Sequence, residues 1–118
     1  MAVTAFHEDS EAFCPNFQRA IELIGSRWTG AVIRALRSGL FRFSDLTTNI
    51  PGLSDRMLSE RLKELEAEGI VSRIVIPETP VKVEYHLTEK GKALERVMTE
   101  VADWAERWVA EPQAAASG

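Results

Sequence analysis

Glycines and prolines interrupt this sequence at short intervals, and this spacing limits the length of every element before the last. The breaks fall at Gly25, at Gly39, in NIPGLS (49–54), at Gly69 and in PETP (77–80). Gly adopts positive φ and Pro fixes φ and lacks an N–H, so both types mark turns. Apolar residues follow helical spacing before Gly69 and a β-type pattern after it. The 118 residues therefore predict one domain of short helices, a hairpin and a longer final helix.

Two helices are expected before residue 40 and a short third helix follows them. The first spans 16–24 and the second spans 26–38, each with apolar residues at helical spacing. In the third, FSDLTTNI, Ser44 is the expected N-cap, since a serine side chain accepts from the first free N–H groups. This helix must end before Pro51, because proline disfavours helical geometry in the preceding residue.

The fourth helix lies in LSDRMLSERLKELEAEGIV (53–71) and has clear boundaries. Ser54 is a good N-cap and Gly69 a good C-terminal stop. At 100° per residue the buried side is predicted to hold three leucines, Leu58, Leu62 and Leu65. The opposite side then carries Arg56, Ser59, Glu60, Lys63 and Ala67. This side is either an ordinary solvated face or a surface that contacts a partner.

A β-hairpin and a long helix complete the chain. IVSRIVI (70–76) and KVEYHL (82–87) are rich in β-branched residues, and the prolines between them suit a projecting loop. Alternation in the second segment places Val83, Tyr85 and Leu87 on a buried face. Thr88 can cap a last helix that begins at Glu89. Its apolar stripe comprises Leu94, Val97, Met98, Val101, Trp104, Ala105 and Trp108.

The net charge of −4 is unevenly distributed. Residues 1–18 and 93–118 together contribute −6, which leaves the middle of the chain at +2. Within it, residues 23–44 hold Arg27, Arg34, Arg37 and Arg42 and no acid. Such a local basic patch suits phosphates, although charge alone is equally compatible with a solvated helix face.

Catalytic and metal-binding signatures are lacking in the sequence. It has no phosphate-binding glycine loop, no nucleophile elbow and no histidine spaced to act with Cys14. His7 and His86 do not have the spacing of metal ligands. We therefore expect neither an enzyme, nor a cofactor, nor a bound metal.

The single cysteine and the short apolar runs indicate the compartment. Cys14 has no intramolecular partner for a disulfide, which suits a reducing environment. No run is long enough for a membrane span, and the acidic start is unlike a secretory signal. The expectation is a cytoplasmic protein without membrane contact.

The order of elements and three motifs resemble the HxlR-type regulators, relatives of the MarR family. The motifs are CPNFQRAIELIGSRWTGAVIRAL, RFSDLTTNIPGLSDRMLSERLKELEAEGIVSR and PVKVEYHLTEKG, and the likeness runs from Cys14 to Trp108. The resemblance implies a winged helix-turn-helix, mainly α with a small β-hairpin wing (α+β). Residues 14–110 would form this domain with terminal dimerisation helices, between an N-terminal arm (1–13) and a disordered tail (111–118). It also implies a homodimeric bacterial transcription factor on a two-fold symmetric double-stranded DNA operator.

The same resemblance assigns residues 54–68 as the recognition helix and 73–82 as the wing. Arg56 in the first helical turn can hold guanine with two parallel hydrogen bonds, whereas Lys63 is better placed for a phosphate. Glu60, like Asp55, departs from the neutral or basic side chains frequent in the family, and a carboxylate can accept from cytosine N4. Arg73 and Lys82 flank the wing loop and can reach the sugar-phosphate backbone or the minor groove; the alternative is a charge pair with Glu84 across the hairpin. The expected DNA-binding set is Arg27, Ser44, Ser54, Arg56, Ser59, Glu60, Lys63, Arg73 and Lys82.

A long apolar stripe on the last helix predicts a dimer seam, because one small domain cannot cover it. The expected seam residues are Phe17, Leu94, Val97, Met98, Val101, Trp104, Ala105 and Trp108. Trp28 is interpreted as core, and a ligand cage built from the tryptophans is the less favoured alternative.

Cys14 is a possible redox switch at the start of the first helix, where the helix dipole favours the thiolate. The resemblance supports it, since several HxlR-type regulators sense oxidants through an N-terminal cysteine. Nearby acids and burial would instead make the thiol inert. Two other functions stay open: a winged-helix protein-interaction module, and a regulator that binds a small molecule at the dimer interface.

Overall fold

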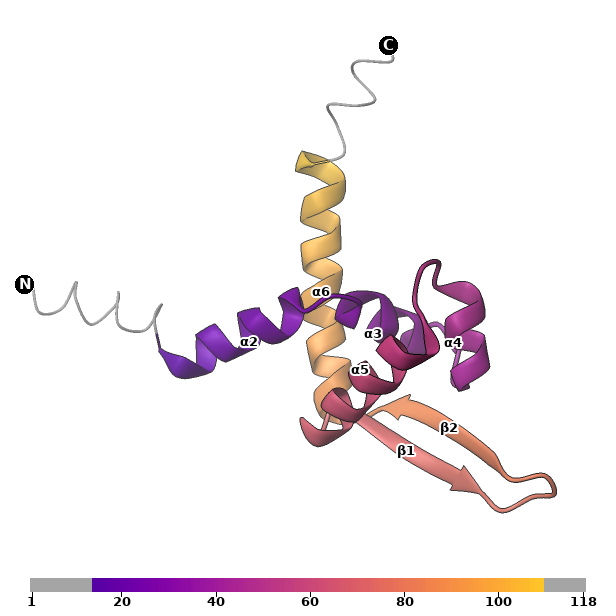
Figure 1. Ribbon diagram of the computed structural model, residues 1–118. Helices are drawn as coiled ribbons and strands as arrows, with labels where there is room; N and C mark the ends of the chain where they lie inside the picture. The colour runs from indigo at the N-terminus through magenta and orange to yellow at the C-terminus, as the bar shows by residue number, and fades with distance from the viewer. Residues whose placement is uncertain (1–13, 110–118) are drawn as a thin grey trace, which may run out of the picture.

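The computed structural model describes residues 14–109. The expected N-terminal arm (1–13) and disordered tail (111–118) lie outside the described residues. Figure 1 shows the elements in the predicted order. They are α2 (Pro15–Gly25), α3 (Thr29–Arg37), α4 (Phe43–Asn49), α5 (Asp55–Ala67), β1 (Val71–Ile76), β2 (Lys82–Leu87) and α6 (Glu89–Trp108).

The core lies where α3, α4, α5, the base of the hairpin and the lower part of α6 meet. Its fully buried large side chains are Val32, Ile33, Leu36, Leu46, Leu58, Leu65 and Ile70. Burying an aliphatic side chain of this size stabilises a fold by roughly 1.5–3 kcal/mol. This cluster therefore holds the helix-turn-helix unit and the wing in one body.

The boundaries of α5 are those predicted. The Ser54 hydroxyl accepts from the Met57 N–H at 3.1 Å, and Gly69 follows the last turn. All three predicted leucines are buried on one side of the helix. Because they fix its rotation, the Arg56 and Lys63 side is turned to solvent.

The second helix begins later than expected. α3 starts at Thr29, and Trp28 precedes it with a φ of +74°, a left-handed conformation that is uncommon for a bulky residue. A side chain at Gly52, whose φ is +83°, would place its Cβ 3.3 Å from the Trp28 ring. The expected helix over 26–38 is thus wrong for its first three residues, where a turn seats Trp28 under the turn between α4 and α5.

The short helix α4 also starts earlier than its predicted cap. It begins at Phe43, with Arg42 as the N-cap residue and without a side-chain cap bond. Ser44 therefore lies inside the first turn, and its expected role as N-cap is wrong. Phe43 is partly buried against the core, and this packing sets the start of the helix.

The wing is a two-stranded antiparallel hairpin with Val71 opposite Leu87 and Ile76 opposite Lys82. The Tyr85 N–H donates to the Phe41 carbonyl at 2.8 Å, which ties the segment before α4 to β2. The expected alternation of buried and exposed residues in β2 is not observed, because all six residues are half-buried. A projecting hairpin has no layer covering either face fully (Figure 1).

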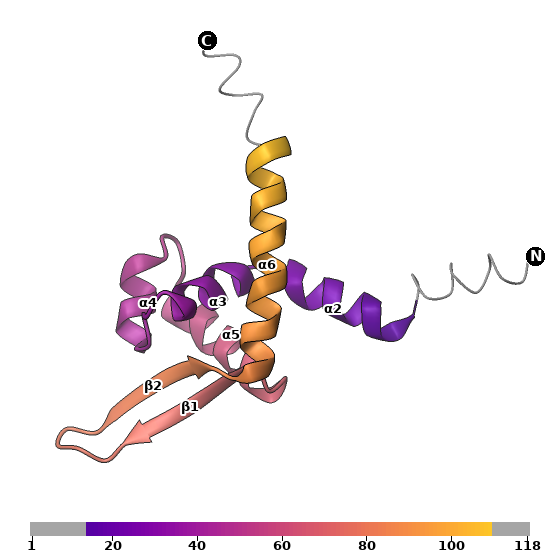
Figure 2. The same ribbon diagram turned by 180° about the vertical axis from the view of Figure 1, so that it is seen from behind.

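The last helix is capped as predicted, since the Thr88 hydroxyl accepts from the Gly91 N–H at 3.0 Å. Its N-terminal half packs on the core, whereas its C-terminal half and α2 project from the body (Figures 1 and 2). No residue of α2 is buried. Within residues 14–109, no helix combines the length and the apolar content needed to cross a membrane.

Candidate nucleic-acid interface

The exposed face of α5 carries several of the predicted DNA-binding residues. Arg56, Glu60 and Lys63 are exposed and Ser59 is half-buried. The Ser54 hydroxyl oxygen caps the helix by accepting from the Met57 N–H, which leaves its O–H group as a donor. This exposed face belongs to a helix whose opposite side is buried in the core and whose N-terminus is capped by Ser54.

Arg56 and Glu60 form a pair one helical turn apart. The Arg56 Nε lies 3.4 Å from Glu60 Oε2, with the arginine side chain 88% exposed. Exposed pairs of this kind contribute about 0–1 kcal/mol, so little free energy is needed to part them. Arg56 is free to turn to a base, and Glu60 then remains as a separate acceptor.

Lys63 differs from Arg56 in having no partner in the part of the chain that the structure describes. Its neighbour Arg61 pairs with Glu64 instead. An exposed, unpaired ammonium can approach a phosphate without losing an internal contact. This geometry suits the backbone contact expected of it.

The two wing cations have different surroundings. Arg73 is exposed and lies opposite Tyr85, whereas Lys82 pairs with Glu78 in the loop at 3.4 Å. The expected alternative, a pair between these cations and Glu84, is wrong: Glu84 lies opposite Ile74 and bonds His86 at 2.8 Å. Arg73 is therefore the freer of the two for DNA.

Two of the four arginines of residues 23–44 line different hollows. Arg34 lines a hollow with Met98 and Val101, whereas Arg37 lines a separate hollow with Phe41 and pairs with Glu95 at 3.4 Å. Arg34 and Arg37 are three residues apart and are therefore neighbours on the exposed side of α3. The phosphate-binding patch that the sequence suggested, with a solvated helix face as its alternative, stays a prediction.

Arg27 and Ser44 lie near the helix-turn-helix turn without forming part of the α5 face. Arg27 is exposed and its guanidinium lies 5.3 Å from the centre of the Trp28 ring, a cation–π distance. Ser44 is exposed in the first turn of α4. Both remain accessible to the sugar-phosphate backbone.

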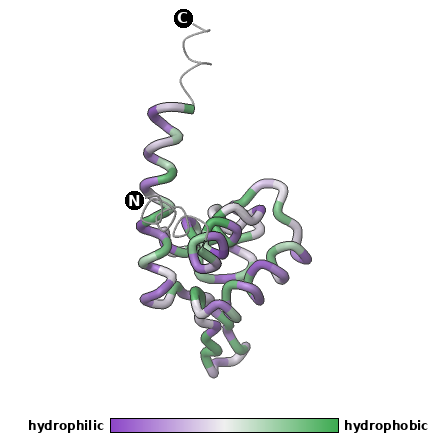
Figure 3. The backbone as a smooth tube through the Cα atoms, turned by 90° about the vertical axis from the view of Figure 1, so that its left-hand side faces the viewer, coloured by the Kyte–Doolittle hydropathy of each residue, from purple (hydrophilic) through white to green (hydrophobic). Residues whose placement is uncertain are grey.

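The apolar stripe of α6 is exposed along the projecting half of the helix. Trp104 is 61% and Trp108 60% exposed, and Phe17 of α2, Val97 and Val101 are about half exposed. Figure 3 shows hydrophobic positions recurring along α6 up to its end. Leu94 and Ala105 are half-buried. Met98, expected in the seam, is instead buried in the protomer, where Gly30 of α3 leaves room for it.

Cys14 is the N-cap residue of α2. Its Sγ accepts from the Phe17 N–H at 3.4 Å, and the residue is half-buried. Pro15 occupies the first helical position, where no N–H is needed. The sulfur thus lies at the N-terminal end of a helix that projects from the body (Figure 1).

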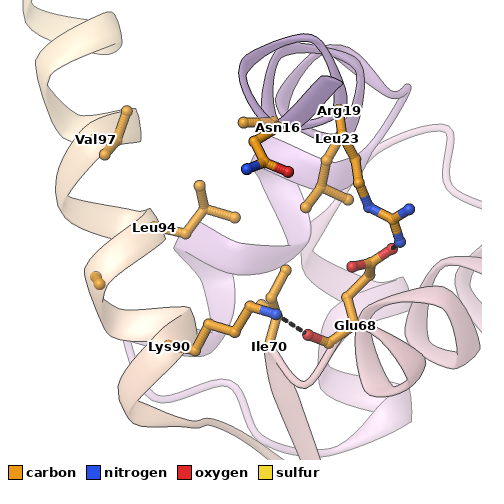
Figure 4. Close-up of a pocket in the computed structure, with 10 residues that line it drawn as sticks. Asn16, Arg19, Leu23, Glu68, Ile70, Lys90, Leu94 and Val97 are labelled. Atoms are coloured by element: carbon orange, nitrogen blue, oxygen red, sulfur yellow. Dashed lines mark hydrogen bonds and ion pairs between the residues drawn. The ribbon is translucent and has the colours of Figure 1, made fainter. Parts of the chain in front are cut away.

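A hollow of about 510 Å³ separates α2 from α6 and the end of α5 (Figure 4). Arg19 of α2 forms an ion pair with Glu68, and the Lys90 ammonium donates to the Glu68 carbonyl at 2.6 Å. Leu23, Ile70 and Leu94 provide apolar walls. The sequence reasoning missed the contacts of Arg19, Glu68 and Lys90, because these residues are up to 71 positions apart on three elements and no local pattern links them.

Comparison with known proteins gives a consistent result. The sequence model of the HxlR-like helix-turn-helix family matches residues 23–113. The chain is 50% identical over 96 residues to the HTH-type transcriptional regulator YvaP of Bacillus subtilis, covering 81% of this chain and 89% of YvaP. It is 52% identical over 95 residues to the regulator YodB of the same organism, covering 80% and 85%.

Solved structures agree with the sequence matches. Reduced YodB superposes with a TM-score of 0.75 at 52% identity, covering 84% of this chain and 96% of that one. The redox regulator HypR in its reduced form gives 0.74 at 35% identity, covering 82% and 96%. YodB has also been solved in diamide-treated and quinone-bound forms, and HypR in an oxidised form.

Proposed function

This chain belongs to the HxlR-like helix-turn-helix family, and from that membership we propose that it is a transcriptional regulator that binds a two-fold symmetric DNA operator as a homodimer. One observation carries the proposal. The capped helix α5, which follows the helix-turn-helix turn, buries its leucines and presents Arg56, Ser59 and Lys63 to solvent. Such a helix fits the major groove, where base edges are distinguishable.

Each DNA-binding residue has a distinct proposed role. Arg56 donates two hydrogen bonds to a guanine, Glu60 accepts from a cytosine N4, and Lys63 binds a phosphate. The remaining contacts are to the sugar-phosphate backbone from the helix-turn-helix and the wing. They are assigned to Arg27, Ser44, Ser54, Ser59, Arg73 and Lys82.

Dimerisation supplies the symmetry of the operator. The exposed stripe of Phe17, Val97, Val101, Trp104 and Trp108 is proposed as a self-complementary interface, with Leu94 and Ala105 at its edge. A two-fold interface of this kind presents two α5 helices to successive major-groove turns, roughly 34 Å apart.

Cys14 is proposed as the switch of this regulator. YodB and HypR are similar to this chain and have been solved in states that differ in oxidation. With diamide, the Cys14 thiol and a second thiol would each lose one proton and one electron, forming an S–S bond while the diamide is reduced to its hydrazine. As the chain has one cysteine, the second thiol is a partner protomer's Cys14 or a low-molecular-weight thiol.

The test begins with genome-wide capture of bound DNA, which identifies the operator. Affinity for that duplex should then fall steeply with salt, because each neutralised phosphate releases counterions with a slope of about −0.9 per contact. No enriched site, together with no salt-dependent binding of duplex DNA, would leave the protein-interaction module as the function.

The switch is tested on the same duplex. Diamide should change the operator affinity of the wild type and leave Cys14→Ser unchanged. Equal responses of the two proteins would reduce Cys14 to a helix cap. The hollow between α2 and α6 then favours the second candidate, a small-molecule effector bound beside the dimer interface.

A further inference from the structure

A second hollow, of about 450 Å³, lies away from α5, between the end of α3, Phe41, β2 and the first half of α6. Its apolar residues are Leu36, Phe41 and Leu87. Its polar residues are Arg37, His86, Lys92, Glu95 and Arg96. None of the DNA-binding or dimerisation residues described above lines it, and its volume is that of a small-molecule site.

The polar lining is predominantly cationic in a protein whose net charge is −4. Arg96 has no carboxylate partner within residues 14–109, and Lys92 has only the fully exposed Glu89 at 3.6 Å. An exposed pair of that kind contributes little. Two of the three cations are therefore available to an anion.

Glu95 is the one acid that lines the hollow, and it is already engaged. It is 6% exposed, lies 3.4 Å from the Arg37 Nε and accepts from the Thr99 hydroxyl at 2.8 Å. A buried carboxylate requires such partners, since desolvation penalises an isolated charge. Glu95 thereby holds Arg37 at the wall, while the guanidinium keeps further N–H donors.

One wall contains two aromatic rings that stack on each other. The rings of Phe41 and His86 stack with centroids 4.0 Å apart and an interplanar angle of 26°. Glu84 fixes the edge of His86 at 2.8 Å, and the Tyr85 N–H bonds the Phe41 carbonyl. These bonds hold the stacked pair in place, and a planar ligand can pack against its outer face or its edges.

The hollow stays open in the proposed dimer. At 100° per residue, Lys92 and Arg96 lie roughly 130° around α6 from the exposed stripe of Val97, Val101 and Trp104. Figure 2 shows β2 and α6 in front of α5 on this side of the molecule. The site is therefore separate from both the dimer seam and the recognition helix.

We propose that this hollow binds a small planar anion, an aromatic or heteroaromatic ring that bears a carboxylate or a phosphate. The ring packs on the Phe41 and His86 wall and the anionic group pairs with Arg96 and Lys92. The ligand would touch α3, the wing and α6 together. On the proposed function, binding would therefore alter the angle between the wing and the dimerisation helix.

The experiment titrates the free protein without DNA, so its result does not depend on operator binding. Side-chain NMR signals of His86 are followed and are assigned with His7→Gln, because the chain has two histidines. Benzoate and phenyl phosphate distinguish the anionic groups, and cyclohexanecarboxylate and inorganic phosphate are the non-planar and ring-free probes. We expect saturable shifts with benzoate or phenyl phosphate, and binding at least about tenfold weaker in Arg96→Gln, the loss typical of one charge-assisted contact.

Arg107→Gln is the matched control, since it removes the same charge from α6 outside the hollow. It should bind like the wild type. Equal weakening by both substitutions, or no shift of His86 with any probe, would overturn the site. Equal affinity for benzoate and cyclohexanecarboxylate, or for phenyl phosphate and inorganic phosphate, would overturn the assignment of a planar ring.

Discussion

Arg56 and Lys63 lie on the same exposed face, but replacing each with alanine should affect DNA binding differently. Arg56→Ala should cost about 1–3 kcal/mol on the operator and relax one base position, because it removes a pair of hydrogen bonds to a base. Lys63→Ala should weaken specific and random duplexes alike. Competition binding against single-base operator variants measures both effects, and wild-type behaviour of the two mutants would reject α5 as the recognition helix.

Gly91 is required by close packing rather than by the chemistry of the interface. A Cβ there would lie 2.2 Å from the Ile70 carbonyl oxygen, so backbone must move. Gly91→Ala should lower the free energy of unfolding by about 1–3 kcal/mol or more, as overpacking does, measured by urea denaturation. Gly25→Ala is the control: nothing lies within 4 Å, and alanine favours the helix, so stability should be kept or raised. Equal stability of both variants would contradict this packing.

At the residue scale, the sequence predicts which side chains are buried or exposed where the geometry of a single helix decides it. Helical spacing was sufficient to place Leu58, Leu62 and Leu65 inside and Lys63 outside. It could not give the left-handed Trp28, whose conformation depends on contact with a turn 24 residues away. It also could not pair Arg37 with Glu95, since that contact requires α3 to pack on α6.

At the element scale, the side-chain caps explain which boundaries were predictable. Ser54 and Thr88 bond the N–H groups at the start of their helices, as local sequence indicated. α4 has no such cap, and its start at Phe43 follows from packing. The position of α2 was not predictable for the same reason, because a tertiary ion pair between Arg19 and Glu68 links it to the end of α5.

That ion pair predicts how a signal at Cys14 reaches α5. Leu23 and Ile24 of α2 pack against the core, and the Arg19 contact adds a direct link between this helix and Glu68, the C-cap residue of the recognition helix. Arg19→Gln should leave the reaction of Cys14 with diamide intact but reduce the change in operator affinity several-fold. Mass spectrometry checks the first and fluorescence anisotropy the second.

Gln18→Ala is the control for this coupling, since the Gln18 side chain bonds to Glu22 of its own helix. It should respond to diamide like the wild type. An undiminished response in Arg19→Gln would mean that the signal passes through the dimer interface instead.

At the scale of the whole molecule, the two ends of the chain carry net negative charge and its middle carries net positive charge. This distribution fits a protein whose middle binds DNA and whose ends form a dimer interface. The sequence predicted the order of elements and the apolar stripe, because both follow from periodicity, whereas the fold class was implied by the family resemblance. The sequence assigned Met98 to the exposed stripe, because helical spacing alone cannot distinguish a residue that packs on α3 from one that stays exposed on the surface. The two hollows that Arg34 and Arg37 line likewise required the packed structure.

The exposed stripe leads to the prediction that the protein is a dimer through α6 and α2. Val101→Glu places a carboxylate in the middle of the stripe, where a partner would bury it unpaired, a cost of several kcal/mol. Sedimentation velocity should show monomers, and operator binding should weaken because each half-site is then bound alone. Arg96→Glu, which introduces the same charge on the other flank of α6, should remain dimeric. A dimer that survives Val101→Glu would place the interface on another surface, and the two α5 helices would then need a different spacing on DNA.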